Sequence, residues 1–342
     1  MVYSFELIKH ANIRYRESLP SLACCELFAM LFSLGIRCPL SLESMGGSQF
    51  LTFECRELSG PELVYLSGHS SVVFMAEKIG GMLRPLPVVS PAYLPDDLPE
   101  VLKYKGKTGV TFTRMMISTA AALSPFVRHE DPLTFFDPLC GRGTACFCAL
   151  TAGMNAFGLD VDRKDIREAA DYFSRYLKFH KLKHTERSVS VTAKGHSLPV
   201  SEFIFTDTKE HYQSGNTRQL RLACSDTADS PFLFRKARAH LIAEDLPYCV
   251  QHAPRANGKT DTLQGFLERG LPVWKKCLEP GGVIALSFNT FTLPSSSVRS
   301  ALENAGFTLP DNDLFYSLKH EVEQAVMRDV IFAFNTQEES VK

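Results

Sequence analysis

Four turns that carry acidic residues follow apolar segments of the sequence, at points where strands would end. They begin at Asp137, Asp160, Asp226 and Asp245. The first turn reads Asp-Pro-Leu-Cys-Gly-Arg-Gly-Thr, and its glycines permit positive φ and let a ligand approach the backbone closely. It has neither the spacing of a dinucleotide-binding fingerprint nor the lysine of a phosphate-binding loop, and its acidic residue repels pyrophosphate. The first turn therefore suits a cationic or neutral ligand that carries hydroxyl and amino groups.

The second and third turns add groups that a nucleoside would contact. Asp160 lies 23 residues after Asp137, a spacing at which an acidic side chain meets ribose hydroxyls. Asp226 stands between Ser225 and Thr227, and its carboxylate can accept a hydrogen bond from an adenine amine. Three acids at successive strand ends predict a nucleoside ligand. The alternative interpretation is that these acids cap the helices that follow the strands.

The fourth turn, Asp245-Leu246-Pro247-Tyr248, has groups that can hold a planar amine. The Asp oxygens and the neighbouring carbonyls can accept both protons of an amino group, which directs the nitrogen lone pair toward an electrophile. Tyr248 presents a ring face on which a base can stack, a contact worth about 1–3 kcal/mol. The tetrapeptide alone is usually an ordinary turn, but its place as the fourth strand-end turn in order favours a catalytic site.

A sheet of mostly parallel strands would bring these turns together, because ligands bind at the carboxyl ends of such strands. The hydrophobic pattern predicts strands at 134–137, 156–160, 219–224, 240–243 and 282–288, and two final strands near 314–318 and 325–334. It predicts helices at 110–123, 144–152, 162–179, 232–237, 262–278 and 295–305. This alternation is typical of an α/β fold with helices on both faces. Residues 185–216 depart from it and predict an added β-hairpin that turns near Lys194.

The first 84 residues predict a separate, smaller domain. The sequence predicts strands at 2–8, 40–45, 50–55 and 72–77, and helices at 19–34 and after Ser59 as N-cap. This order is the ferredoxin-like β-α-β-β-α-β pattern. Five prolines in residues 85–99 exclude a helix or a central strand there. We therefore expect a ferredoxin-like domain at 1–84, a Pro-rich linker at 85–100 and the α/β domain at 101–342.

The segments DPLCGRGT, GLDVD, SDTAD and DLPYC, in that order, resemble the motifs of S-adenosylmethionine-dependent amino-methyltransferases. The resemblance is greatest to RNA guanine-N2 methyltransferases that usually carry a THUMP domain. It extends over residues 101–342 and includes Lys105-Gly-Lys-Thr108. It implies a class I methyltransferase sheet of seven strands with a reversed final strand, and S-adenosylmethionine as the cofactor.

The resemblance also implies roles for individual residues. The residues implied to bind the cofactor are Asp137, Pro138, Leu139, Cys140, Gly141, Gly143 and Thr144 at the methionine portion, Asp160 at the ribose, and Asp226 and Thr227 at the adenine. Asp245, Pro247 and Tyr248 are implied to be the catalytic residues that hold the target amine. Neither a metal nor a covalent intermediate is expected.

The substrate implied by the resemblance is an exocyclic amino group of an RNA base, with guanine N2 in tRNA favoured. Asp245 and Leu246 stand where the family more often has Asn and Pro, and 1–84 is too short for a full THUMP domain in addition to its ferredoxin-like companion. The alternatives are amino groups of DNA adenine or cytosine, a protein glutamine amide, and a non-catalytic, cofactor-binding adaptor. A small activating protein is a further partner to consider.

A basic run at 172–184 is the clearest candidate for contact with a nucleic acid. It holds Arg175, Lys178 and Lys181 and no acidic residue. We expect these three residues, together with Leu246, to bind the substrate, and the alternative is a solvated helix face. Residues 1–100 contain 7 basic and 11 acidic residues, which argues against a broad nucleic-acid platform there.

The composition is that of an ordinary folded protein of 342 residues. A hydrophobic content of 45% and a net charge of -1 exclude disorder as the main state. We find no membrane-spanning stretch and no secretory signal, so we expect a cytoplasmic protein without membrane contact. The ten cysteines include no CxxC pair, and we expect reduced, mostly buried thiols.

Overall fold

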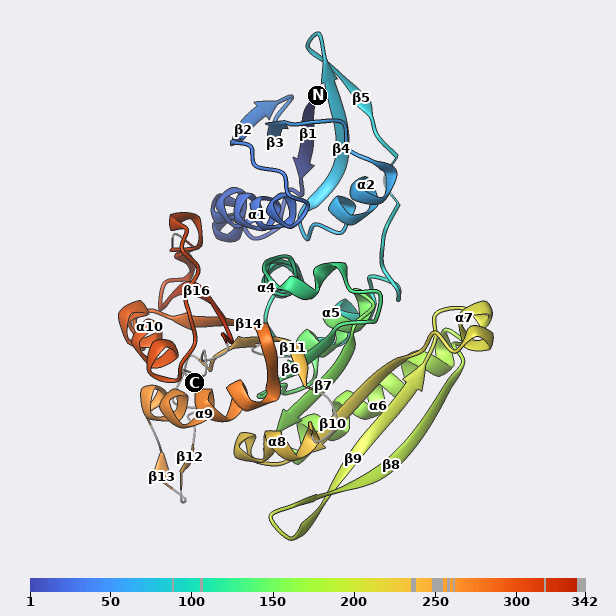
Figure 1. The fold of residues 1–342 in the computed structure, drawn as a ribbon, viewed down its shortest axis with the longest axis vertical. Coiled ribbons are helices and arrows are strands. Elements are labelled where there is room, and N and C mark those ends of the chain that lie inside the picture. The colour runs from blue at the N-terminus through green and yellow to red at the C-terminus, as the bar shows by residue number, and fades with distance from the viewer. Residues whose placement is uncertain are drawn as a thin grey trace, which may run out of the picture.

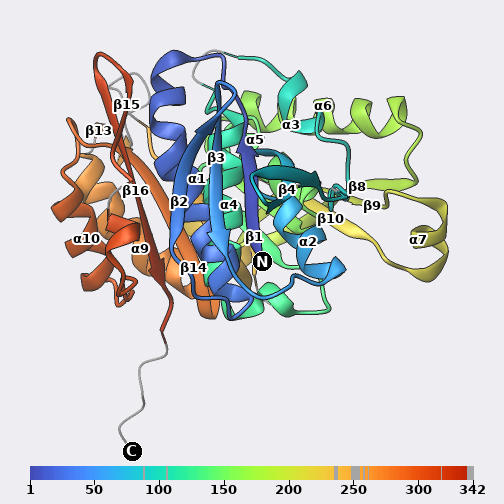
Figure 2. The same cartoon turned by 90° about the horizontal axis from the view of Figure 1, so that it is seen from above.

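The computed structural model describes residues 1–87, 89–104, 107–234, 238–247, 255–256, 259–260, 262–316 and 318–336. Two main sheets are present, a small one near the N-terminus and a larger one formed by the rest of the chain (Figure 1). Seen from above, the small sheet lies over the middle of the larger body, between α10 on one side and α7 on the other (Figure 2).

The N-terminal elements form an antiparallel sheet with its two helices on the side of the larger body (Figure 1). In chain order they are β1 (Val2–Leu7), α1 (Ile13–Ser33), β2 (Leu40–Met45), β3 (Ser48–Glu54), α2 (Gly60–Ser67), β4 (Val72–Ile79) and β5 (Met82–Pro85). The strand order β2-β3-β1-β4-β5 is the ferredoxin-like arrangement with one added edge strand. Ser59 precedes α2 as its N-cap, and its N–H donates to the Glu62 carboxylate at 2.8 Å. The predicted ferredoxin-like fold is confirmed.

The larger sheet contains the motif-bearing strands. Its described strands are β6 (Thr134–Asp137), β7 (Asn155–Asp160), β8 (His184–Ala193), β9 (His196–Phe205), β10 (Arg218–Cys224), β11 (Ala239–Asp245), β14 (Leu278–Asn289), β15 (His320–Glu323) and β16 (Val326–Phe334). They lie in the order β15-β16-β14-β11-β6-β7-β10-β9-β8. From β10 to β14 neighbouring strands are parallel, whereas β16 runs antiparallel to β14. Without the β8–β9 hairpin this is the predicted class I methyltransferase sheet with a reversed final strand.

Helices cover both faces of this sheet. One face carries α4 (Val110–Leu123), α5 (Thr144–Thr151) and α6 (Arg163–Phe179), and the other carries α8 (Ser230–Leu233), α9 (Leu263–Cys277) and α10 (Ser295–Asn304). The remaining described elements are α3 (Leu98–Val101), α7 (Lys209–Ser214), the 3-10 helices Pro125–Arg128, Thr227–Asp229 and Asp313–Tyr316, and a short strand pair, β12 (Arg255–Ala256) and β13 (Lys259–Thr260).

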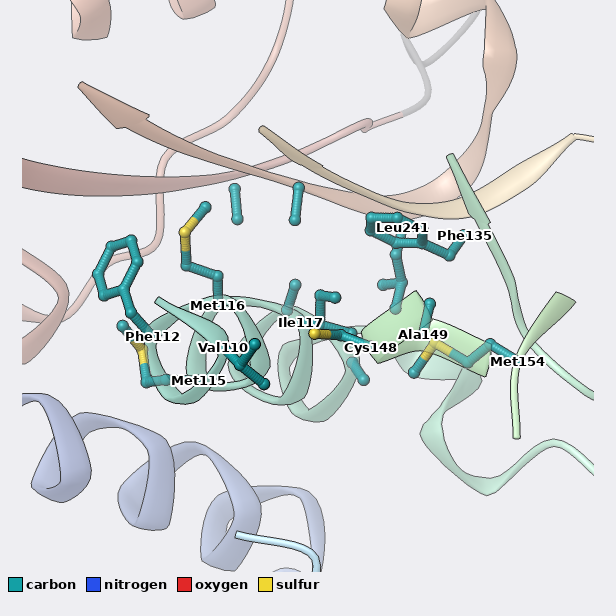
Figure 3. Packing of buried hydrophobic residues seen from close by; sticks show 14 of the residues in the cluster. Val110, Phe112, Met115, Met116, Ile117, Phe135, Cys148, Ala149, Met154 and Leu241 are labelled. Atoms are coloured by element: carbon teal, nitrogen blue, oxygen red, sulfur yellow. The ribbon is translucent and has the colours of Figure 1, made fainter. Parts of the chain in front are cut away.

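Helix α4 joins the two parts of the molecule. It packs against β11 and β14 on one side and against α1 on the other. Met116 lies on the side of the sheet and Met115 on the side of α1 (Figure 3). One continuous cluster of buried apolar side chains therefore includes residues of the N-terminal domain, α4 and the larger sheet. Each large side chain buried there stabilises the fold by about 1.5–3 kcal/mol.

The last part of the sheet differs from the prediction. Residues 314–318 were expected to form a strand, but Asp313–Tyr316 is a 3-10 helix and the strand β15 begins at His320. The Asn312 side chain accepts a hydrogen bond from the N–H of Leu314 at 2.9 Å, which starts a turn. Phe315 is buried in the core from this turn, so its apolar character reflects packing rather than a strand.

The Pro-rich segment expected as a linker is held against the larger body. The Tyr93 N–H donates to the Thr151 carbonyl at 2.8 Å, and the Tyr93 hydroxyl donates to the Asn216 carbonyl at 3.0 Å. Leu94 is buried, and α3 begins at Leu98 inside the expected linker. The domain boundaries at 84 and 101 stay predictions.

Candidate functional site

The carboxyl ends of four strands bring the predicted acidic residues to one edge of the larger sheet. Asp137 ends β6, Asp160 ends β7 and Asp245 ends β11, while Asp226 follows the end of β10 by two residues. Because these strands are parallel and lie in the order β10-β7-β6-β11, their ends meet at the same edge. We call this edge the carboxyl edge.

The glycine turn after β6 lies across the end of β7. The Cys140 N–H donates to the Leu159 carbonyl at 2.9 Å, and the Gly141 N–H donates to Asp160 Oδ2 at 2.8 Å. Gly141 has a φ of 48°, and a Cβ added to it would meet no atom within 4 Å. Its backbone therefore faces open space, which is where a ligand could approach it.

Close packing under this turn explains a third glycine, Gly158 of β7. A Cβ at this position would lie 2.8 Å from Cys140 Sγ and 2.9 Å from Leu222. Since Cβ atoms do not approach other atoms so closely, only glycine lets the turn settle on β7. Gly143, at a φ of 83°, begins α5 in a conformation that other residues rarely adopt.

A segment before α4 adds an aromatic side chain that the sequence analysis did not single out. The Tyr104 hydroxyl lies 2.8 Å from Thr144 Oγ1, at the start of α5. The Arg142 guanidinium lies over the Tyr104 ring, 5.0 Å from its centroid, and forms an ion pair with Asp165 at 2.9 Å. These contacts fix the Tyr104 side chain beside the glycine turn. A tyrosine outside any motif gave no signal of this contact.

The third turn partly follows the alternative interpretation of helix capping. Asp226 Oδ1 accepts a hydrogen bond from the Ala228 N–H at 2.8 Å and so caps a 3-10 turn. Asp160 Oδ1 likewise accepts from the Asp162 N–H at 2.8 Å. A carboxylate has about four acceptor positions, so capping leaves room for a ligand hydroxyl or amine. The side chain of Thr227 is buried and accepts a hydrogen bond from Trp274 Nε1 at 2.6 Å, which places it in the core.

Two carboxyl groups are buried together at this edge. Asp137 and Glu244 are both buried and in contact, and burial is the main cause that raises the pKa of each, with mutual repulsion raising that of Glu244 further. Within the described residues, Glu244 Oε2 has no hydrogen-bond partner. A cationic group of a ligand would reduce the repulsion between the two carboxylates. It would thereby take the place of the proton that the pair otherwise retains. Glu244 is a candidate site residue that sequence reasoning did not name, and the signal that could have found it is a single acidic residue inside the apolar strand β11.

Among the described residues, three donors surround the carboxylate of Asp245 in the fourth turn. Ser287 Oγ donates to Asp245 Oδ1 at 2.7 Å, and Thr108 Oγ1 donates to Oδ2 at 2.5 Å. Arg328 Nη2 lies 3.4 Å from Oδ2. The donors come from β14, from the segment before α4, and from β16, so residues far apart in the sequence orient one side chain.

The other residues of the fourth turn have different environments. Pro247 is half-buried. Leu246 is only 1% exposed and its side chain packs in the core, so its backbone alone is left to meet a substrate, and the expectation that Leu246 binds the substrate stays a prediction. Tyr248, predicted to be catalytic, and Cys249 lie outside the described residues.

The basic residues predicted to bind the substrate lie at the far end of α6. This helix begins next to Asp162 at the carboxyl edge, and Lys178 comes 16 residues later, about 24 Å away at about 1.5 Å per residue. Lys178 Nζ contacts Ser174 at 2.9 Å and Glu186 at 3.8 Å, and Arg175 donates to the Asp171 carbonyl. Arg175, Lys178 and Lys181 therefore do not join Asp245, and a role in holding a distant phosphate stays a prediction.

A cavity of about 470 Å³ lies elsewhere, between the N-terminal domain and the amino ends of β6 and β7. Its lining includes His69, Arg114 and Glu130 and none of the predicted site residues. Among the described residues, no group of His, Cys, Asp and Glu is arranged to hold a metal ion. No helix in the described part of the chain is long and apolar enough to cross a membrane.

The residues of the carboxyl edge fit S-adenosylmethionine. The open backbone face at Gly141 and the partnerless oxygen of Glu244 are the observations that support this fit. Asp137 and Glu244 would face a cationic group, and Asp160 would face hydroxyls.

Comparisons with known proteins give remote structural similarities. No protein-family model matches the sequence, and no curated protein matches it. TrmN from Thermus thermophilus has 15% identity, with 87% of this chain and 59% of that chain covered, at a TM-score of 0.38. The rRNA methyltransferase aviRa from Streptomyces viridochromogenes has 12% identity, 70% and 93% coverage and a TM-score of 0.42. Magnesium protoporphyrin IX methyltransferase from Synechocystis PCC 6803, solved with bound S-adenosylmethionine, has 13% identity, 70% and 89% coverage and a TM-score of 0.40.

This chain thus spans 59% of the length of TrmN. Likenesses this remote carry no argument about substrate or partners. The class I methyltransferase fold of this chain rests on its own strand order and on the reversed strand β16.

Proposed function

We propose that this protein is an S-adenosylmethionine-dependent N-methyltransferase that acts on an exocyclic amino group of an RNA base. The observation that carries the proposal is the meeting of the glycine turn, the acid pair and Asp245 at one edge of a parallel sheet. The bound cofactor would supply a methyl group made electrophilic by its sulfonium charge. The finer proposal, guanine N2 in tRNA, is supported only by the resemblance of the segments DPLCGRGT, GLDVD, SDTAD and DLPYC.

The protein would bind the cofactor through charge and backbone complementarity. Asp137 and Glu244 form a buried carboxyl pair that would release its retained proton when an ammonium group binds, which favours such a group over a neutral one. Asp160, fixed by the Gly141 N–H, would accept hydrogen bonds from ribose hydroxyls. The turn at Gly141 permits the ligand to lie against the backbone.

Asp245 would orient the target amine. Its carboxylate is fixed by Ser287 and Thr108, so an amino group that donates to it would be held in one direction. Orientation of this kind contributes much of the acceleration in transfer between two bound groups, since reacting atoms must come within about 3–3.5 Å. The Pro247 ring restricts the backbone at its own position, and Tyr248 would stack on the base.

An exposed aromatic residue at the carboxyl edge supports a planar substrate. Phe291 is 64% exposed and follows the end of β14, the strand beside β11. Asn289 holds its turn: Oδ1 accepts from the Phe291 N–H at 3.2 Å and from the Met327 N–H at 3.1 Å. Exposed aromatic rings on fixed turns are suited to stacking with unpaired bases.

A turnover assay tests the proposal. The purified chain is incubated with methyl-labelled cofactor and, separately, total tRNA, rRNA, DNA and protein, and labelled RNA is digested to nucleosides to identify the product. We expect label in tRNA as N2-methylguanosine. Label only in DNA or protein would support one of the other substrates, and cofactor binding with no transfer to any acceptor would support the adaptor.

The Asp245→Ala variant tests the assigned role. We expect loss of transfer with cofactor affinity within about twofold of wild type, because the carboxylate touches the substrate side of the site. Calorimetric titration measures the affinity, and Asp171→Ala, on the exposed face of α6, is the matched control. Full activity of Asp245→Ala would refute the role.

A further inference from the structure

A buried arginine reaches the candidate active site from an element that carries no motif. Arg328 lies on the reversed strand β16 and is 6% exposed. It is aligned with Asn289 of β14, while Asp245 of β11 is aligned with Ser287 of the same strand. The arginine side chain therefore crosses β14 to place Nη2 at 3.4 Å from Asp245 Oδ2.

The environment of Arg328 fixes its guanidinium in place. The guanidinium carbon lies 4.2 Å from the centroid of the Phe112 ring on α4. A planar guanidinium can stack on a ring and pair with a carboxylate at the same time, which an ammonium cannot do equally well. Since a buried charge without a counter-ion is costly, Arg328 and Asp245 hold each other in this arrangement.

The N-terminal domain contributes an aromatic ring to the side chains packed near Arg328. Tyr15 of α1 lies with its ring centroid 6.5 Å from Phe112 and 6.3 Å from His320 of β15, and Phe112 and His320 are 5.4 Å apart. Tyr15 Oη has no hydrogen-bond partner among the described residues, so Tyr15 contributes its ring.

His320 does not compete with Arg328 for the carboxylate. Burial, reinforced by the charge of Arg328, lowers the pKa of His320 to about 4. Its imidazole is therefore neutral at neutral pH and acts as a packing surface. Arg328 is a cation that pairs with Asp245 within the described part of the chain.

We propose that Arg328 is a positioning residue for Asp245, and that the N-terminal domain holds it through Tyr15 and Phe112. The inference rests on the proposed function, in which Asp245 accepts hydrogen bonds from the target amine. Paired with Arg328, Asp245 is a fixed acceptor whose charge is balanced. The ferredoxin-like domain thus contributes to catalysis through the contact of Tyr15 with Phe112, in addition to any contact with the substrate.

The first test compares Arg328→Met and Arg328→Lys with wild type in the methylation assay. We expect Arg328→Met to lower kcat about 10- to 100-fold, because small displacements of a positioned group cost this much. Cofactor affinity should stay within about twofold, since the cofactor residues lie on the other side of the edge. Arg328→Lys should restore part of kcat, because it keeps the charge but not the stacking on Phe112.

Arg221→Met is the matched control. Arg221 of β10 is also partly buried, lies 5.2 Å from the Phe157 ring and pairs with Glu202 at 3.6 Å. Like Arg328, it lies near an aromatic ring and pairs with a carboxylate, but that carboxylate is not Asp245. We expect it to lower the melting temperature and leave kcat unchanged.

The second test concerns the N-terminal domain. Tyr15→Ala should lower kcat several-fold, whereas Tyr15→Phe, which keeps the ring, should match wild type. In the Arg328→Met background Tyr15→Ala should have no further effect on kcat, because neighbouring mutations in one pathway are not additive. Tyr15→Ala and Arg328→Lys also test the proposal if Arg328→Met does not fold.

The outcomes separate this inference from the proposed function. Wild-type kcat in Arg328→Met, or an equal loss of kcat in Arg221→Met, would overturn the positioning role and leave the methyltransferase activity standing. Absence of cofactor binding and transfer in the wild-type protein would contradict the proposed function and, with it, this role.

Discussion

Glu244 places its carboxyl group beside that of Asp137, and both side chains are buried. Two carboxylates at such close range cannot both ionise without a cation, so the pair retains a proton at a pH where an exposed acid has lost it. The sheet geometry causes this contact, because β6 and β11 are neighbours and both end at the carboxyl edge. In the proposed function the pair is balanced by the positive charge of the cofactor.

The acid pair predicts a pH-dependent stability. Because the pKa of Glu244 is raised in the folded protein, the folded state binds more protons than the unfolded state above the ordinary carboxyl range, and stability falls as pH rises. Glu244→Gln removes this titration. We expect its urea midpoint to fall less than that of wild type between about pH 5 and about pH 8.

The matched control for this measurement is Glu210→Gln, a change of an exposed glutamate on α7. It should follow the wild-type pH dependence. An equal fall in midpoint for Glu244→Gln and wild type would contradict the sharing of a proton between Asp137 and Glu244.

At the scale of elements, the site is assembled by turns at the ends of strands. The glycine turn lies on β7, the Thr108 segment precedes α4, and the turn around Phe291 is tied by Asn289 to the β15–β16 connection, whose Ala325 carbonyl accepts from Asn289 Nδ2 at 3.0 Å. Turns on a rigid sheet can hold a binding residue in place and still leave its ring exposed.

We expect Phe291, in the turn after β14, to contact the substrate. Phe291→Ala should raise KM for the methylated RNA several-fold with little change in kcat, cofactor affinity or melting temperature, because the ring is exposed in the free protein. Tyr212→Ala is the control, since Tyr212 is another exposed aromatic residue, 51% exposed on α7 and outside the basic run 172–184. Equal effects of the two substitutions on KM would show that Phe291 has no special place in recognition.

Much of the fold could be predicted because the period of apolar residues and the turn residues are local signals. The strand 134–137 and the helix 110–123 have the predicted bounds, and the ferredoxin-like order follows from the N-terminal pattern. The prediction of a strand at 314–318 is wrong, because an apolar residue buried from a turn, such as Phe315, gives the same signal as a strand residue.

The candidate site was predictable only in part. The acids at the strand ends could be placed at one edge from the topology, but their partners could not. Thr108, Ser287 and Arg328 reach Asp245 from separate elements, and no short-range pattern marks such contacts. Thr227 and Leu246 belong to motifs, yet their side chains pack in the core, a fact that depends on Trp274 and on β14 rather than on the motif.

At the scale of the whole molecule, the two parts share one apolar core. Buried residues of α1 pack against α4, which in turn packs on the larger sheet (Figure 3). A domain that is joined to its neighbour through a shared core gains much of its stability from that contact. The N-terminal domain is therefore expected to unfold with the larger body.

Equilibrium unfolding in urea tests this expectation. The fluorescence of Trp274, the one tryptophan of the sequence, reports on the larger body because this residue of α9 is fully buried, while far-UV circular dichroism reports on both parts. We expect coincident midpoints from the two probes, as for a single cooperative transition. Two separated transitions in circular dichroism, only one of them seen by fluorescence, would contradict the shared core.

The β8–β9 hairpin leaves a ten-residue strand, β8, at the rim of the larger sheet, and no described strand pairs with its outer side. A rim of this length offers backbone N–H and carbonyl groups on which a second chain could add a strand. The exposed side chains of β8 disfavour such pairing. Glu186 and Arg187 are charged, and Ser188 and Ser190 are polar. We therefore expect the polar side chains of β8 to disfavour aggregation by strand addition at high protein concentration.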